Sequence, residues 1–160
     1  MNLCELWRRI RIPLWLVILM TCGGIIGGLL GGFMLTFQFG NYHAGTWSFL
    51  SAIPALWCLH LHSLHYFKSL DVVHTSISLK VIAHCSSAIS MVSFLAALTY
   101  LTLALLFRQP LFPINHSFVL AAVQAFLNTK WHLLLRYHAK RYRMLLDEGY
   151  FTDLTAPEGV

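Results

Sequence analysis

The chain has 160 residues and a net charge of +5, and 58% of its residues are hydrophobic while only 11% are charged. Soluble domains usually carry about 25% charged residues. This composition, with a mean hydropathy of +0.66, excludes an ordinary solvated globule and indicates an all-α membrane protein. Flanking segments that face anionic lipid account for the positive charge, so we expect no nucleic-acid partner.

Four apolar segments are each long enough to cross the hydrocarbon core, which takes about 20 helical residues. We expect four transmembrane helices, near residues 12–39, 47–67, 77–107 and 111–143. Basic residues occur before the first helix, between the second and third, and after the fourth, whereas the opposite side has only Arg108. The positive-inside rule therefore predicts that both termini are cytoplasmic. We expect one transmembrane domain over residues 1–146 and a cytoplasmic tail over 147–160.

The first helix contains the segment CGGIIGGLLGGFM, in which pairs of glycines repeat every four positions. A glycine weakens a helix by about 1 kcal/mol relative to alanine, so the repeat needs a reason. In lipid, small residues let two helix backbones approach closely. We favour packing against the third helix, which has its own stripe of small residues, and homo-oligomerisation through the glycine face is the alternative. That stripe consists of Ser86, Ser90, Ser93 and Ala97.

Nine histidines are an unusual number for a chain of this kind. The second helix has three of them in the segment HLHSLH, where His62 and His65 share a face and His60 points away by about 160°. His84 lies in the third helix and His116 in the second exoplasmic loop. Imidazole binds transition metals and haem iron. A single histidine more often only hydrogen-bonds a neighbouring helix, but that explanation is weaker for the whole set.

All six acidic residues lie in segments expected to be cytoplasmic. A carrier of bare metal ions or protons that uses carboxylates inside the membrane is therefore disfavoured. The expected ligand instead brings its own negative charge and a large apolar body.

The fourth helix supplies groups for such a ligand. Lys130 lies within the helix without an acidic partner, and His138 and Tyr142 share one face further on, among basic residues. Rings interleaved with cations suit a flat macrocycle with carboxylates. A helix that lies on anionic lipid accounts for the same composition equally well. The basic residues of this segment are Lys140, Arg141 and Arg143.

The segment TKWHLLLRYHAKRYR, residues 129–143, resembles the end of the HRG (heme-responsive gene) haem transporters. In that family a Lys-Trp pair is followed by an aromatic–Ala–basic–basic–Tyr motif, which reads HAKRY here, with His138 in place of the usual Phe or Tyr. The segment ALWCLHLHSLHYF is similar to the family's second helix and puts the family's histidine at His62. His116 lies in the loop where the family has a functional histidine.

The resemblance implies a haem transporter rather than an enzyme, located in the endolysosomal or plasma membrane, that moves haem from the exoplasmic side into the cytosol. It implies that His62 and His116 are candidate ligands of the haem iron, with His65 or His84 assisting His62. His138 and Tyr142 would receive the macrocycle, and Lys130, Lys140 and Arg141 would attract its propionates. Two alternatives stay open: a b-type cytochrome or reductase with haem between His62 and His84, and a scaffold that does not transport.

Overall fold

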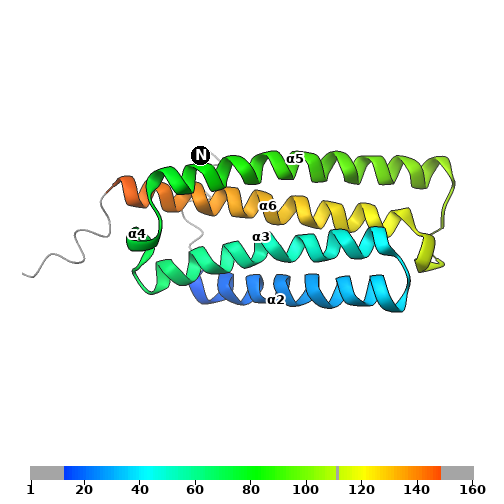
Figure 1. Cartoon of the computed structure of the whole chain (residues 1–160), viewed down its shortest axis with the longest axis horizontal. Coiled ribbons are helices and arrows are strands. Elements are labelled where there is room, and N and C mark those ends of the chain that lie inside the picture. The colour runs from blue at the N-terminus through cyan, green and yellow to red at the C-terminus, as the bar shows by residue number, and fades with distance from the viewer. Residues whose placement is uncertain (1–12, 111, 149–160) are drawn as a thin grey trace, which may run out of the picture.

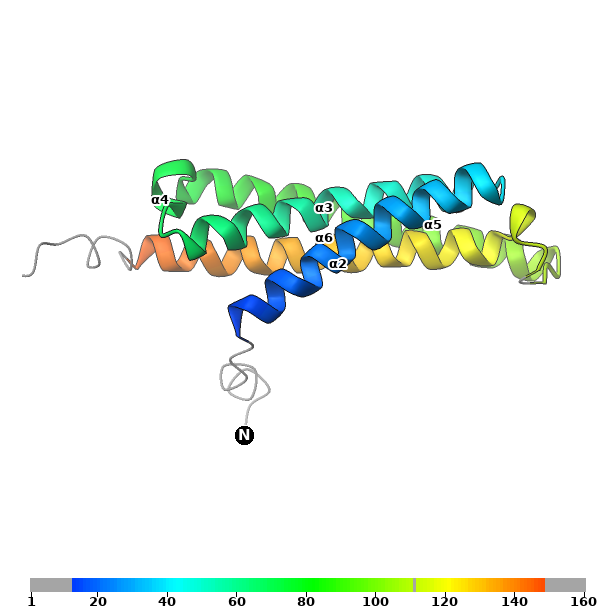
Figure 2. The same cartoon turned by 90° about the horizontal axis from the view of Figure 1, so that it is seen from below.

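The computed structural model describes residues 13–110 and 112–148, and every regular element in these ranges is helical. Three of the four long helices run side by side along a common axis, and the fourth, α2, crosses them obliquely (Figure 1 and Figure 2). The four are α2 (Leu14–Phe33), which continues into the π-helical turn η1 (Met34–Gln38), α3 (Tyr42–Tyr66), α5 (Ser76–Leu106) and α6 (Phe118–Asp147). Two short elements, α4 (Leu70–Val73) and the 3-10 turn η2 (Ile114–His116), lie in the connections.

Helix α6 lies between α5 and α3, and α2 packs on the side of α3 (Figure 1). The N-terminal end of α2 turns away from the other long helices (Figure 2). Near α4, the helices α3, α5 and α6 share an apolar cluster that includes Leu61, Leu79 and Leu135, each almost fully buried. This cluster adjoins the residues with which the candidate site is built.

Three of the long helices are long and apolar enough to cross a membrane: Leu14–Gln38, Ser76–Leu106 and Phe118–Asp147. Large apolar side chains such as Leu30, Ile53 and Val92 are exposed along the bundle, as expected for helices in contact with lipid. The structure therefore supports a membrane protein with three candidate spans. Helix α3 is less apolar because histidines and buried serines interrupt its sequence, and its role as a fourth span stays a prediction. The termini lie outside the described residues.

Polar caps shift two helix boundaries from the expected positions. Helix α3 begins at Tyr42 rather than at residue 47, because the Asn41 side chain accepts a hydrogen bond from the N–H of Ala44 at 3.0 Å. Helix α6 begins at Phe118 rather than at residue 111, because η2 precedes it and Gln109 Oε1 accepts the Phe118 N–H at 3.0 Å. Both corrections place polar side chains at the same end of the bundle.

The glycine repeat packs against α3, so the expectation that it packs against the third helix, α5, is wrong. A Cβ at Gly28 would lie 3.0 Å from Ala52 Cβ, and one at Gly32 would lie 2.6 Å from Phe49 Cδ1. Nothing lies within 4 Å of such an atom at Gly23 or Gly27. Gly31 also faces α3, where a Cβ would lie 2.9 Å from Ser48 Oγ. Self-association through this helix stays a prediction, and Gly23 and Gly27 are the glycines of the repeat left for it.

The small residues of α5 have a different partner from the one expected. Ser86, Ser90, Ser93 and Ala97 are buried, and α5 packs chiefly on α6. Asn128 Nδ2 on α6 donates a hydrogen bond to Ser93 Oγ at 2.8 Å. Close packing of α5 thus positions α6 rather than the glycine helix.

Candidate functional site

Four ring side chains meet where α3 packs on α6, and we refer to them as the ring cluster: His62, His65, His138 and Tyr142. His62 is 1% exposed and Tyr142 3% exposed. The Nδ1 atom of His62 is 2.6 Å from the Tyr142 hydroxyl oxygen. Ring centroids are 4.4 Å apart for His62 and His138, and 4.9 Å apart for His65 and Tyr142. The structure thus brings together four of the residues singled out from the sequence.

Helical spacing and one small residue explain why the rings meet. Leu135, Ala139 and Tyr142 follow one another at intervals of four and three residues, so they share the buried face of α6. Ala139 is fully buried and has no side chain beyond Cβ. At this level α3 can approach closely, and the longer rings of His138 and Tyr142 on either side of Ala139 reach His62.

The second ring nitrogen of His62 has no partner among the described residues. Its Nε2 is buried without a hydrogen bond. An unpaired buried polar group costs about 1–3 kcal/mol, so it needs an explanation. When Nδ1 carries the proton and donates it to the Tyr142 hydroxyl, Nε2 presents a lone pair. That arrangement, in which the other ring nitrogen is held by a hydrogen bond, is typical of metal-binding histidines.

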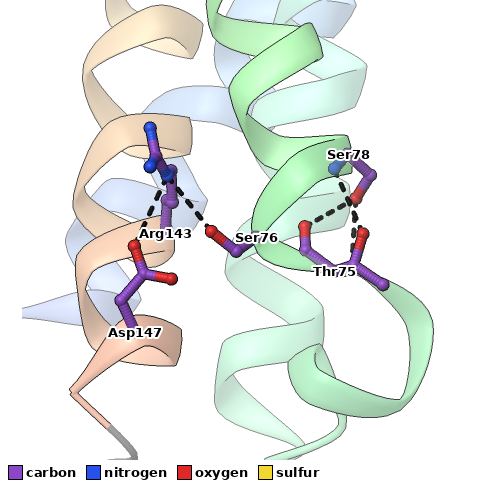
Figure 3. A network of polar contacts seen from close by, with 5 residues as sticks. All are labelled: Thr75, Ser76, Ser78, Arg143 and Asp147. Carbon is purple, nitrogen blue, oxygen red and sulfur yellow. Dashed lines mark hydrogen bonds and ion pairs between the residues drawn. The ribbon is translucent and has the colours of Figure 1, made fainter.

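Cationic side chains lie near the ring cluster. The Arg141 guanidinium lies within electrostatic range of His62, His65 and His138, and Lys140 is exposed beside it. The side chain of Arg143 is engaged elsewhere: its Nε donates to Ser76 Oγ at 3.1 Å and lies 3.4 Å from Asp147 Oδ2 (Figure 3). Lys140 and Arg141 are thus better placed than Arg143 to meet an anionic ligand.

His84 and Lys130, both singled out from the sequence, lie away from the ring cluster. His84 is exposed on α5, and its Nδ1 donates to the Lys80 carbonyl at 2.7 Å. No ring contact joins it to His62, so the structure does not form the His62–His84 pair that a cytochrome would need. Lys130 is on the face of α6 opposite Ala139, about 180° around the helix. There it lines an apolar groove with Phe126, Thr129, Leu133 and Leu134.

His116 lies at the far end of the bundle, in a pocket of ≈ 290 Å³ that we refer to as the mouth pocket. Asn41 anchors this end: its Nδ2 donates to the Ile114 carbonyl at 2.7 Å and to the Ser117 carbonyl at 3.1 Å. His43 Nδ1 and the Tyr100 hydroxyl are 3.2 Å apart beside the pocket. The lining residues are Asn41, His43, Gln109, Asn115, His116 and Phe118.

The two sites lie at opposite ends of one helix. At 1.5 Å per residue, His43 in the mouth pocket and His62 in the ring cluster are about 28 Å apart along α3. This separation is close to the thickness of a hydrocarbon core, about 30 Å. A ligand that passed from one site to the other would therefore cross most of a membrane.

His43 and His132 were not among the candidate site residues predicted from the sequence. His43 joins the mouth pocket only because α3 begins earlier than expected. His132 shares the buried face of α6 with Asn128, four residues earlier, and its Nδ1 is buried without a hydrogen bond among the described residues. That i, i+4 spacing of polar residues was the available signal for His132.

A further histidine pair lies outside both sites. The Nε2 atoms of His60, on α3, and His74, just before α5, are 3.3 Å apart. Burial, and to a lesser extent the neighbouring His60, lowers the pKa of His74. Across the described residues, no group of three or more His, Cys, Asp or Glu side chains could hold a metal ion.

The chain is similar over most of its length to a known heme transporter. The chain is 28% identical over 157 residues to the heme transporter hrg-1 of Caenorhabditis elegans, a match that covers 96% of this chain and 78% of the relative. The relationship is distant. No family model and no solved structure matches the chain. The relative agrees with the resemblance drawn from the sequence motifs, and three residues of those motifs, His62, His138 and Tyr142, belong to the ring cluster.

Proposed function

We propose that this protein is a membrane transporter of haem. The observation that carries the proposal is the buried His62 Nε2, which has no hydrogen-bond partner among the described residues and lies in a cluster of rings. Haem iron accepts an imidazole nitrogen as axial ligand, and its porphyrin already supplies the other ligands. One well-placed histidine therefore suffices for haem, whereas a bare metal ion needs more than one protein ligand. The distant haem-transporter relative supports the same substrate.

The transporter we propose has four membrane spans and both termini in the cytosol. Helix α3 lies between α2 and α6, two helices that are apolar and long enough to cross a membrane. Its 25 residues extend over about 37 Å, enough to cross the hydrocarbon core beside them. The polar side chains that lower its hydropathy, including Ser48, Ser51 and His62, are buried against neighbouring helices and avoid lipid.

Haem moves from the mouth pocket to the ring cluster in this proposal. His116, with His43 nearby, receives haem on the exoplasmic side, and His62 binds the iron within the bundle. His138 and Tyr142 then accept the macrocycle at the cytosolic end. Lys140 and Arg141 attract the propionates, whose negative charge is costly to bury without partners. Lys130 offers a further cation beside the apolar groove on the outer face of α6.

The ring cluster has to open before haem can bind there. The rings of His62 and His138 are already in contact, with centroids 4.4 Å apart, so a porphyrin cannot lie between them. Binding at His62 Nε2 therefore requires that His138 moves away. The Tyr142 hydroxyl can stay on His62 Nδ1 and hold the tautomer that presents the lone pair to iron.

Directional transport towards the cytosol fits a protein of the endolysosomal or plasma membrane, where haem arrives from outside the cytosol. The test is the growth of haem-synthesis-deficient cells at limiting haem, with the parent chain and an empty vector compared. The parent is expected to support growth, and equal growth with the empty vector would refute transport. Haem content after purification distinguishes a transporter from a cytochrome. A transporter releases its haem, whereas a cytochrome retains one haem per chain and loses it in the His84→Ala variant.

A further inference from the structure

His60 and His74 face each other across the connection between α3 and α5. Their Nε2 atoms are 3.3 Å apart, and their ring planes meet at 80°. His60 is exposed on α3, and Trp57 lies edge-on beside it with ring centroids 5.7 Å apart. The pair is separate from the ring cluster, because His60 and His62 point about 160° apart around the helix.

Hydrogen bonds at the start of α5 favour one tautomer of His74. The Ser78 hydroxyl donates its one hydrogen to the Thr75 carbonyl at 2.9 Å and accepts the Thr75 N–H at 3.1 Å (Figure 3). Ser78 Oγ is also 3.2 Å from His74 Nδ1. When the hydroxyl hydrogen goes to the Thr75 carbonyl, no second hydrogen is left to donate, and Nδ1 of His74 is the donor in this contact.

The consequence is that His74 Nε2 presents its lone pair to His60. A neutral imidazole has one N–H and one lone pair, so a proton on Nδ1 leaves Nε2 unprotonated. Metal-binding histidines usually have their second ring nitrogen held as a donor in this way, which fixes both the tautomer and the ring orientation. The helix cap formed by Thr75 and Ser78 therefore also orients His74.

The spacing of the two nitrogens suits a tetrahedral metal ion. Two imidazole nitrogens bound to one zinc ion at about 2.0–2.1 Å in tetrahedral geometry lie about 3.3 Å apart. The observed distance is 3.3 Å. The same distance does not suit haem, whose two axial nitrogens lie on opposite sides of the iron and are separated by two full bond lengths.

We propose that His60 and His74 bind one divalent transition-metal ion of the zinc class, with water in the remaining positions. Imidazole nitrogen suits Zn²⁺, Ni²⁺ and Cu²⁺. Without metal, His60 Nε2–H donates to His74 Nε2. When metal binds, the proton of His60 moves through solvent from Nε2 to Nδ1, and both Nε2 lone pairs go to the ion. The ion then joins the end of α3 to the segment that starts α5.

The test uses the full-length, tag-free, haem-free protein in nanodiscs and Zn²⁺ as the probe in calorimetry. The parent is expected to bind one Zn²⁺ per chain, and His60→Ala and His74→Ala are each expected to lose that site. With Cu²⁺ in its place, electron paramagnetic resonance is expected to show two nitrogen ligands in the parent and one in each variant. Circular dichroism checks that both variants keep the helical content of the parent.

A matched pair of variants tests the role of Ser78. Ser78→Ala removes the group that orients His74 and is expected to weaken Zn²⁺ binding about tenfold, as loss of such an outer partner typically does. Thr75→Ala removes the helix cap but leaves the Ser78 hydroxyl, so parental affinity is expected. Equal affinities in Ser78→Ala and the parent would overturn the proposed geometry.

Two outcomes would overturn the site itself: no Zn²⁺ binding by the parent, or one Zn²⁺ still bound in both His60→Ala and His74→Ala. The site is independent of the proposed haem transport. His62→Ala is expected to bind Zn²⁺ as the parent does, and failure of the metal site would leave the growth test of transport unaffected.

Discussion

At the Asn41 end of α3, His116 is exposed in a polar pocket, whereas at the other end His62 is 1% exposed among rings in contact. Amide side chains hold the first end together through bonds to loop backbone. The second end is held by ring packing and the bond between His62 and Tyr142. An open histidine can exchange its ligand readily, while a closed one needs a rearrangement first. We infer that the open end determines haem capture and the closed end its passage and release.

The largest effect is expected from His62→Ala, which removes the candidate ligand at the closed end. Haem-dependent growth should be lost at both limiting and abundant haem, because the variant removes the iron ligand proposed within the bundle. Growth is measured at equal protein abundance, which immunoblotting checks. If this variant supported growth equal to that of the parent at limiting haem, the role proposed for the closed end would be wrong.

A smaller, conditional effect is expected from His116→Ala at the open end. Capture weakens, so growth should fall at limiting haem and recover when haem is abundant, unlike that of His62→Ala. A haem dose series of growth rates measures this difference. If the two variants shifted the dose series in the same way, the division of roles between the ends would be wrong.

The double variant Lys140→Ala/Arg141→Ala should also slow transport, with a smaller effect than either histidine variant. Loss of two cations near the ring cluster removes the partners proposed for the propionates. Delivery to the cytosol, followed with a cytosolic haem reporter, should slow more than the affinity for haem falls. An unchanged delivery rate would show that the cations serve the lipid surface instead.

The smallest effect on transport, but a clear one on stability, is expected from the glycine helix. Gly28→Leu should destabilise the fold by about 1–3 kcal/mol, because the new side chain overlaps Ala52 and Ser48 of the helix that connects the two ends. Gly27→Leu is the matched control and should keep the parental melting temperature, since nothing lies within 4 Å of its position. Equal melting temperatures for both variants would contradict the packing of α2 on α3.

Hydropathy and length predict the long helices of this chain well, because both are properties of single segments. The partner of the glycine helix could not be predicted in this way. Small-residue stripes on α2 and α5 look alike in sequence, and only the three-dimensional arrangement decides that Gly28 meets Ala52 while Ser93 meets Asn128. Helix starts were also missed where a loop side chain, Asn41, provides the cap.

The ring cluster was partly predictable and the mouth pocket less so. The motif resemblance singled out His62, His138 and Tyr142, and helical spacing put His138 and Tyr142 on one face. The contact between α3 and α6 depends on the buried Ala139. The sequence alone does not show which helix packs against this small residue. His43 was overlooked because its place in a helix depends on the Asn41 cap.

A haemin titration of the purified protein in nanodiscs, followed by the Soret absorption, tests directly whether His62 binds the haem iron. The parent should show a saturable Soret shift typical of histidine ligation. His62→Ala should weaken binding by more than the 10–100-fold that loss of an outer-shell partner costs, while Tyr142→Phe, which removes only the hydroxyl on Nδ1, should fall within that range. A parental Soret shift and affinity in His62→Ala would show that His62 Nε2 does not bind the haem iron.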